Sequence, residues 1–243
     1  MSGKATSRRG GQARSRRNEW ATILVLALVA GGAWAFIEIA DEVVEGEMQS
    51  IDEKLLLSLR SSGDRDDPAG PPWVEEMARD VTALGSVTLL ALLTASVAGF
   101  LSLTGKRWTA RLVIVAVVSG FATSSALKAA FDRPRPDIVG HEMYVSTSSF
   151  PSGHALLSAA TYLTLGALLM RVQPRRRVKA YLLVVSALLT LSVGVSRVYL
   201  GVHWPTDVLA GWAAGATWAL LWWLLARYLQ RRGQIEAEPE AKS

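Results

Sequence analysis

The sequence predicts an all-α protein, a bundle of six transmembrane helices. Half of its 243 residues are hydrophobic, and the mean hydropathy is +0.25. Apolar runs of about twenty residues recur, which is the length that an α-helix needs to cross the ~30 Å hydrocarbon core of a bilayer. Lys and Arg gather in every second segment between these runs, as they do in the cytoplasmic loops of membrane proteins. These observations predict membrane spans rather than soluble domains.

Six apolar segments are long enough to be spans, and their expected bounds are 20–39, 84–103, 109–131, 154–172, 179–198 and 205–229. The first follows a basic stretch and contains Ala33-Trp34-Ala35, which resembles a signal-peptide cleavage site. Its apolar run continues past that site, so we expect an uncleaved anchor. In the last span, Gly211 and Gly215 lie four residues apart, a spacing that allows two helices to approach closely.

The basic segments predict the orientation of the spans. Clusters of Lys and Arg lie within residues 4–17, 106–111, 171–179 and 227–242. If every span crosses once, all four clusters are on one side, which the positive-inside rule makes cytoplasmic. We therefore expect both termini in the cytoplasm. A compact chain with short basic loops indicates a bacterial inner membrane.

Three regions follow from this topology. Residues 1–19 are expected to be a basic cytoplasmic tail, residues 20–232 a single six-span domain, and residues 233–243 a disordered cytoplasmic tail. Within the domain, the acid-rich segment 41–80 is expected outside the cytoplasm. Residues 63–72 of this segment are typical of an irregular loop. Four apolar residues of the segment are spaced as on one face of a helix: Ile51, Leu55, Leu56 and Leu59. This spacing predicts an amphipathic helix at the membrane surface.

Composition excludes several kinds of site. The chain has no cysteine, which excludes disulfides and thiolate metal sites. Its three histidines leave little room for a His-rich metal site, so no metal or other cofactor is expected. The pI of 9.7 would suit a nucleic-acid partner, but the basic residues follow the membrane topology instead. We expect membrane lipids as partners and no nucleic acid, and the oligomeric state stays open.

Three polar clusters interrupt the apolar sequence, at residues 128–136, 151–154 and 196–207. Ionisable groups near a bilayer are costly and are usually retained for function. The first two clusters fall in the loop between spans three and four, and the third falls between spans five and six. Both loops are on the non-cytoplasmic side. We therefore expect the clusters to form one active site at the extracytoplasmic membrane interface.

Lys128 and Arg135 could be cations that extend from a helix end to the membrane surface. They lie, however, on the side that the positive-inside bias leaves poor in cations, and Arg197 joins them from another loop. Bound phosphate would relieve the repulsion, since Arg offers a planar fork for two oxygens and Lys a point charge. The cluster therefore favours phosphate binding. Asp132 is expected to neutralise its neighbour Arg133.

The second cluster, Pro151-Ser152-Gly153-His154, directly precedes an apolar helix. Ser152 could cap that helix, and Gly153 lets the backbone approach a ligand closely. Helix N-termini carry unpaired N–H groups and a partial positive charge, both suited to phosphate. By itself the tetrapeptide fits an ordinary cap equally well.

The third cluster places His203 four residues before Asp207 at the start of the last span. Asp207 by itself is a residue that the helix dipole favours near an N-terminus. Paired with His203, a carboxylate on one imidazole nitrogen would fix the tautomer and leave the other nitrogen as a nucleophile. The orienting logic is that of a Ser-His-Asp triad, with the histidine itself attacking. His141 belongs to no cluster and is expected to be a loop residue.

Taken in order, the three clusters resemble the signature of the type 2 phosphatidic acid phosphatase superfamily, also called lipid phosphate phosphatases. That signature is Lys, six residues, Arg-Pro; then Pro-Ser-Gly-His; then Ser-Arg, five residues, His, three residues, Asp. Every specified position is matched between Lys128 and Asp207. The six-span layout extends the resemblance over most of the chain, apart from the N-terminal tail and residues 41–80.

The resemblance implies a lipid phosphatase that works without a metal ion. His203 would attack phosphorus and form a phosphohistidine, Asp207 would hold His203, and His154 would protonate the leaving oxygen and then activate water. Substrate phosphate would be bound by Lys128, Arg135, Ser152, Gly153 and Arg197. The family suggests phosphatidic acid, phosphatidylglycerol phosphate and undecaprenyl pyrophosphate as candidate substrates.

Three alternatives accompany this interpretation. The signature also resembles that of vanadium haloperoxidases, but those enzymes are soluble, and six spans argue against them. A lipid phosphotransferase would use the same site with an acceptor other than water, and the sequence leaves this open. A non-catalytic protein that binds or transports an anion is the third, and the intact set of His203, Asp207 and His154 argues against it.

Overall fold

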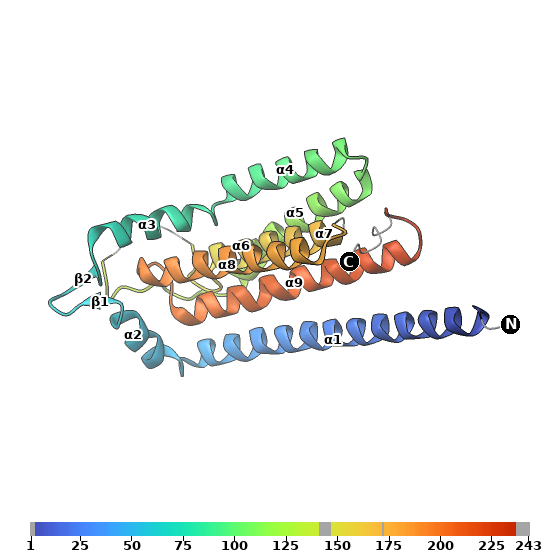
Figure 1. Cartoon of the computed structure of the whole chain (residues 1–243). Coiled ribbons are helices and arrows are strands. Elements are labelled where there is room, and N and C mark those ends of the chain that lie inside the picture. The colour runs from blue at the N-terminus through green and yellow to red at the C-terminus, as the bar shows by residue number, and fades with distance from the viewer. Residues whose placement is uncertain (1–2, 141–146, 172, 237–243) are drawn as a thin grey trace.

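The computed structural model is a bundle of long helices with a short hairpin at one end (Figure 1). It describes residues 3–140, 147–171 and 173–236, with side chains from residue 19 onward. In chain order its elements are α1 (Gly3–Glu45), α2 (Gln49–Leu57), β1 (Arg60–Ser61), β2 (Asp64–Pro68), α3 (Pro72–Ala83), α4 (Val87–Leu103), α5 (Arg107–Ala130), α6 (Gly153–Ser158), the π-helical turn η1 (Ala159–Leu163), α7 (Thr164–Arg171), α8 (Arg176–Tyr199) and α9 (Pro205–Arg231).

The prediction of a six-span helical bundle is confirmed. Five helical stretches are individually long and apolar enough to cross a membrane: 19–45, 107–130, 153–171, 176–199 and 205–231. The sixth span is α3 with α4, two helices joined across a bend of 53°. The bend falls at residues 84–86, so α4 begins three residues later than the sequence predicts.

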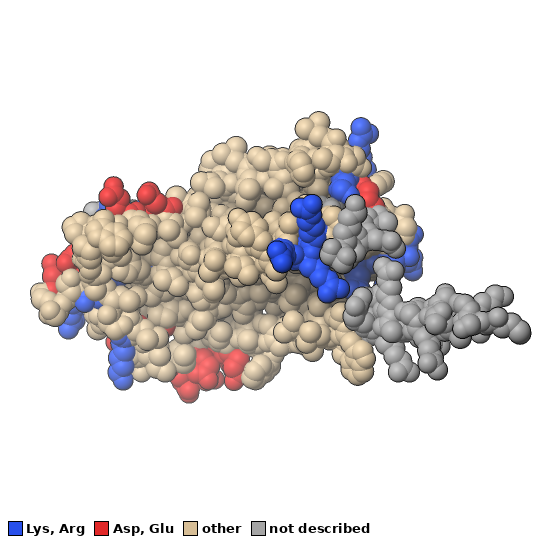
Figure 2. Space-filling model, viewed as in Figure 1, with Lys and Arg blue, Asp and Glu red and all other residues tan. Residues whose placement is uncertain are grey.

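Charged side chains are concentrated at the two ends of the bundle, as expected for a protein whose middle lies in the membrane. In the view of Figure 2, uncharged side chains cover the middle of the molecule, and Lys and Arg gather at the end where both termini lie. Acidic side chains gather toward the opposite end, together with a few basic ones. Large apolar side chains such as Leu92, Val118 and Leu188 are more than half exposed, which suits contact with lipid tails.

The fourth span, made of α6, η1 and α7, is the central helix of the bundle. In its most apolar window 72% of the residues are buried, against 6% for α1, which packs chiefly on α9. The two glycines of α9 permit the central packing: a Cβ at Gly215 would lie 2.5 Å from the Leu156 carbonyl oxygen, and one at Gly211 would lie 2.9 Å from that of Ser152. The expected close approach at these glycines is therefore confirmed.

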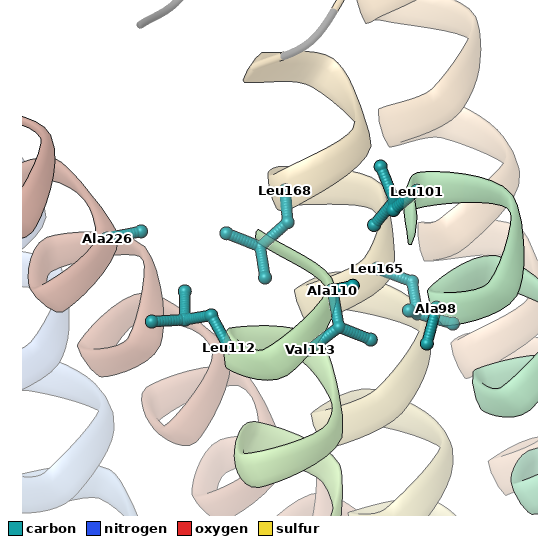
Figure 3. Close-up of a cluster of buried hydrophobic side chains, with 8 residues drawn as sticks. All are labelled: Ala98, Leu101, Ala110, Leu112, Val113, Leu165, Leu168 and Ala226. Atoms are coloured by element: carbon teal, nitrogen blue, oxygen red, sulfur yellow. The ribbon is translucent and has the colours of Figure 1, made fainter. Parts of the chain in front are cut away.

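An apolar cluster closes the bundle at the end away from the hairpin, where α4, α5, α7 and α9 meet (Figure 3). Its buried members are Ala98, Leu101, Ala110, Leu112, Val113, Leu165, Leu168 and Ala226. Because lipid tails are as apolar as these side chains, the cluster stabilises the bundle through close packing rather than through exclusion of water. The cavity described below lies at the opposite end of the bundle, beside the hairpin.

The segment 41–80 is more ordered than the sequence suggests. The helix expected from its apolar spacing exists as α2, but of the apolar residues that predicted it only Leu56 is buried, whereas Ile51 and Leu55 are exposed. The prediction of an irregular loop over residues 63–72 was wrong, because β1 and β2 form an antiparallel hairpin and α3 begins at Pro72.

Long-range contacts explain why this hairpin forms. Arg60 Nη2 donates to the Tyr199 carbonyl oxygen at 2.6 Å, and the Tyr199 hydroxyl donates to the Ala69 carbonyl oxygen at 2.9 Å. On the other strand, the Gly140 amide donates to Asp66 Oδ1 at 2.5 Å. Residues far away in sequence thus hold the hairpin, and a local pattern cannot reveal them.

The two predicted tails also take on structure near the bundle. Helix α1 begins at Gly3, well before the expected start of the first span. At the other end, the Glu236 carboxylate accepts hydrogen bonds from the Trp108 and Thr109 amides at 3.0 and 3.1 Å, and so caps α5. Residues 237–243 lie outside the described part of the chain.

Candidate active site

The three polar clusters meet around one cavity at the hairpin end of the bundle. The cavity has a volume of about 1100 Å³. Six of the eight predicted site residues line it: Lys128, Arg135, Gly153, His154, Arg197 and His203. The other two, Ser152 and Asp207, are fully buried. Residues separated by some eighty positions are thus brought together, as the topology predicts.

Each helix end supplies a different part of this cavity. The last turn of α5 carries Lys128, and Arg135 follows in the loop. The start of α6 supplies Gly153 and His154, and the last turn of α8 supplies Arg197. The sequence folds this way locally because polar residues end or begin each apolar helix, where backbone groups are unpaired.

His203 is buried, with its two ring nitrogens in different surroundings. Nδ1 lies 3.4 Å from Asp207 Oδ2 and 3.2 Å from the Ser149 hydroxyl. Nε2 lies on the cavity side, 3.2 Å from Arg135 Nη1. A proton on Nδ1 would therefore be held by Asp207, and the Nε2 lone pair would face the cations of the cavity. The predicted pairing of His203 with Asp207 is present.

Burial lowers the pKa of His203 from 6.5 to about 4. Desolvation is the largest cause, and the nearby cations Arg197 and Arg135 act in the same direction, while Asp207 opposes it. The ring is therefore neutral at physiological pH. A neutral imidazole keeps the lone pair that a nucleophile needs.

Asp207 is the most heavily hydrogen-bonded carboxylate of the site. Its Oδ2 accepts from the Trp204 amide at 3.0 Å and from the Ser149 hydroxyl, and its Oδ1 accepts from Arg133 Nη1 at 2.6 Å. It therefore both caps the first turn of α9 and holds His203. The sequence offered two interpretations of Asp207, a residue favoured at a helix N-terminus and the partner of His203, and the structure shows both contacts.

The three predicted phosphate-binding cations use only part of their hydrogen-bonding capacity on the protein. Lys128 Nζ donates to the Ser148 carbonyl oxygen at 2.8 Å. Arg135 is more fully engaged: its Nη1 donates to the Val202 carbonyl oxygen at 2.8 Å, and its Nε and Nη2 donate to the Thr147 carbonyl and hydroxyl oxygens at 3.2 and 3.3 Å. Arg197 is 2% exposed; its Nη1 donates to the Thr82 hydroxyl at 3.1 Å, and its Nε has no partner in the described structure. The remaining donors of all three are available to an anion.

The Pro-Ser-Gly-His turn shapes the cavity floor. A Cβ at Gly153 would lie 2.9 Å from Lys128 Cε, so a side chain there would displace the lysine. The Ser152 hydroxyl accepts from the Ala155 amide at 3.5 Å, and the Ser152 amide donates to the Asp207 carbonyl oxygen at 2.9 Å. Ser152 thus caps α6, as one of the two sequence interpretations expects, and ties it to α9.

Arg133 has other partners than the sequence suggests. Its ion pairs go to Asp207 at 2.6 Å and to Asp52 at 2.7 Å, and not to the neighbouring Asp132. The expectation for Asp132 was therefore wrong: residues brought together by the fold neutralise Arg133. Asp52 and Ser149 were missed as site residues, because neither belongs to a polar cluster with recognisable spacing. His141 lies outside the described residues.

The described residues around this cavity can be compared with the arrangement that a metal site needs. Within residues 3–140, 147–171 and 173–236, no group of three or more His, Asp and Glu side chains is arranged to hold a metal ion. The acids that line the cavity, Asp64, Asp66, Asp67 and Glu75, come from β2 and α3. The cations that line the cavity in the described part of the chain are Arg79, Lys128, Arg135 and Arg197.

Comparison with known proteins identifies the family. The PAP2 superfamily profile matches residues 108–231, which include all three clusters. This chain belongs to the PAP2 superfamily. A phosphatidylglycerophosphatase B from Bacillus subtilis strain 168 is 32% identical over 147 residues, covering 59% of this chain and 71% of the relative. The resemblance that the motifs suggested is confirmed.

Other PAP2 members add to this picture. An undecaprenyl-diphosphatase from Sulfolobus acidocaldarius is 38% identical over 68 residues, or 28% of this chain and 29% of the relative. The crystal structure of a transmembrane PAP2-type phosphatidylglycerolphosphate phosphatase from Bacillus subtilis superimposes with a TM-score of 0.74 at 26% identity, covering 84% of this chain and 98% of that one. The relatives and the solved structure are named as phosphatases of different lipids, so the comparisons support a lipid phosphatase without selecting its substrate.

Proposed function

We propose that this protein is a metal-independent phosphatase that hydrolyses a membrane lipid phosphate or pyrophosphate through a phosphohistidine. The observation that carries the proposal is the setting of His203. One ring nitrogen faces the buried Asp207, and the other faces the cation-lined cavity, 3.2 Å from Arg135. This is the arrangement that an oriented nitrogen nucleophile needs.

In the first step, the lone pair of His203 Nε2 forms a bond to phosphorus as the bond to the lipid oxygen breaks. His154 gives its proton to that oxygen, which leaves as an alcohol or, from a pyrophosphate, as a lipid monophosphate. In the second step His154 takes a proton from water, whose oxygen attacks phosphorus and releases His203 and inorganic phosphate. Asp207 stabilises the positive charge on the His203 ring between the two steps.

The phosphoryl oxygens would be held by Lys128, Arg135 and Arg197, with Gly153 leaving room for close approach. Hydrogen-bond donors that are fixed where negative charge develops stabilise the transition state more in a buried site than in water, because they need no reorganisation during the reaction. Ser152 contributes by positioning this turn.

A lipid substrate is supported by the apolar residues that line the same cavity together with the cations. Val87, Phe121 and Leu157, from α4, α5 and α6, line it with apolar surface beside the cations. A phosphate bound by the cations would leave its acyl or prenyl chain against these residues. Among the candidates, phosphatidylglycerol phosphate is our first choice, because both a sequence relative and a solved structure bear that activity in their names.

The test is phosphate release by the purified protein in detergent from phosphatidylglycerol phosphate, phosphatidic acid and undecaprenyl pyrophosphate. We expect release without any added acceptor, which separates hydrolysis from phosphotransfer, and an acid-labile, alkali-stable phosphoprotein in quenched reactions. Release from none of the three lipids would reject the proposal.

We propose further that the site faces the extracytoplasmic side of a bacterial inner membrane, with both termini in the cytoplasm. The charge distribution supports this, since Lys and Arg gather at the end that carries the termini. The absence of cysteine makes the test direct. A cysteine introduced at Ser62 in the hairpin should react with an impermeant maleimide in intact cells, and one at Gln234 should not. The reverse pattern would invert the topology.

A further inference from the structure

Asp52 is a fully buried carboxylate in a segment that the family profile does not cover. It lies on α2, and both of its oxygens are used at the start of α9. Oδ1 accepts from the Thr206 amide at 3.0 Å, and Oδ2 accepts from the Thr206 hydroxyl at 2.5 Å. Oδ2 also accepts from Arg133 Nη2 at 2.7 Å. A carboxylate this buried is costly unless it is paired, so its contacts call for an explanation.

Arg133 connects Asp52 to the candidate nucleophile. One guanidinium nitrogen, Nη2, contacts Asp52, and the other, Nη1, donates to Asp207 Oδ1 at 2.6 Å. The planar group also lies over the Trp204 ring, 5.6 Å from its centroid. A rigid fork that bridges two carboxylates fixes the orientation of both.

Resting on the phosphatase function proposed above, we propose that Asp52 and Arg133 are positioning residues for the nucleophile. Through Arg133, Asp52 fixes the Asp207 carboxylate against His203 Nδ1 and preserves its negative charge. Neither residue lines the cavity, so neither touches the substrate. The segment 41–80 thereby contributes to the chemistry and does more than cover the site.

The reason lies in the charge balance. A bridge between Arg133 and Asp207 alone would be neutral, and its carboxylate would do little for a cationic ring. With Asp52 as the second partner of Arg133, the three groups carry a net charge of −1. When His203 Nε2 bonds to phosphorus, the ring that keeps its Nδ1 proton becomes positive, and this surplus charge stabilises it.

The competing explanation is that Asp52 only fastens α2 to the bundle. Kinetics separate the two. Loss of a positioning contact lowers kcat and leaves phosphate binding intact, because Lys128, Arg135 and Arg197 are untouched. Loss of a purely structural contact either leaves kcat unchanged or loosens the whole site, so that phosphate binding weakens together with kcat.

The experiment compares Asp52→Asn with the wild type in the full-length protein. We expect kcat to fall by about 10- to 100-fold, by analogy with the loss of groups that orient a reactive ligand. The inhibition constant for inorganic phosphate should stay within about two-fold. The matched control is Glu53→Gln, the next residue of α2, whose carboxylate accepts from Gln49 and lies outside the network. It should behave as wild type.

A second variant covers the case in which Asp52→Asn fails to fold. Arg133→Lys keeps the charge but cannot bridge both carboxylates with a planar fork, and it should show the same loss of kcat with unchanged phosphate inhibition. If both variants unfold in detergent, the network is structural and the positioning role is rejected. A folded Asp52→Asn protein with wild-type kcat rejects it as well.

A spectroscopic measurement keeps this proposal separate from the proposed function. The chain has only three histidines, so ¹⁵N-histidine NMR spectra are simple to assign. We expect the His203 Nδ1–H signal of a hydrogen bond to carboxylate in the wild type and in Glu53→Gln, and its loss or shift in Asp52→Asn. If the wild type released no phosphate, the phosphatase proposal would fail, and these spectra would still decide whether Asp52 orients His203. Identical spectra in all three proteins would overturn the inference.

Discussion

The two halves of the candidate site are built differently. Around Asp207 both carboxylate oxygens are engaged, by Arg133 on one side and by Ser149 and the Trp204 amide on the other. Around the cavity, Lys128 and Arg197 each retain donors that the protein does not use. The hydrogen bonds of the nucleophile side are made within the protein, whereas on the cation side a bound phosphate would take up the unused donors. Substitutions on the nucleophile side should therefore lower kcat, whereas those on the cation side should also weaken phosphate binding.

The largest expected effect is on the nucleophile side. His203→Ala removes the only nitrogen proposed to bond to phosphorus, so phosphate release should fall by about 10⁴-fold or more. Binding of inorganic phosphate should persist, because the cations remain. Full activity of the folded variant would remove His203 from the mechanism, and equal loss of binding and rate would erase the contrast between the two halves.

Asp207→Asn should rank next. The amide keeps the size of the side chain but loses its negative charge, so the ring tautomer and the cationic intermediate are less well stabilised. We expect kcat to fall by about 10³-fold with little change in KM. Ser149→Ala is expected to have a smaller effect, since it removes only one hydrogen-bond donor to Asp207 Oδ2 and leaves the charge in place. If Asp207→Asn were no slower than Ser149→Ala, the charge on Asp207 would not matter.

On the cation side, Arg197→Lys should lower kcat/KM by roughly 10²-fold, because one fixed fork of donors is lost. In contrast to Asp207→Asn, this change should also weaken inhibition by inorganic phosphate. Arg79→Lys provides a control at the cavity rim, where Arg79 is exposed and pairs with Glu75. Unchanged phosphate inhibition in Arg197→Lys would show that Arg197 is structural.

The pH dependence sharpens the same contrast. Because the pKa of His203 is lowered to about 4, the ring stays neutral well below pH 6.5. The His203 contribution to kcat/KM should therefore be nearly flat between pH 7 and pH 5, whereas the neutral fraction of an imidazole of ordinary pKa would fall about 25-fold over that range. It should decline only as the pH approaches 4. A decline centred near pH 6.5 would indicate that His203 is less buried than described.

The smallest effect expected is that of chelation. If Lys128, Arg135 and Arg197 supply all the positive charge that the phosphate needs, EDTA should change the rate by less than about two-fold. The control is the same assay with added Mg²⁺. Strong inhibition by EDTA, restored by a divalent ion, would mean that the cation side does not act by itself.

The sequence predicted the cavity side of this site better than the support behind it. Motif residues such as Lys128 and His203 stand out in the sequence because an ionisable group is unusual beside an apolar span, and the topology places their helix ends at the same membrane face. Asp52 does not stand out, because it is one of many acids in residues 41–80 and its partner Thr206 is 154 positions away. The hairpin was missed for the same reason, since contacts to Tyr199 and Gly140 hold it.

Both termini lie at one end of the bundle and the cavity lies at the other, on either side of an even number of spans (Figure 1). If the proposed hydrolysis takes place in this cavity, the freed phosphate is released on the face of the membrane opposite the two chain ends, whichever way the protein inserts. Each turnover would then deliver phosphate to one compartment only. With the orientation proposed above, that compartment lies outside the cytoplasm, and a cell would have to reimport the phosphate in order to use it again.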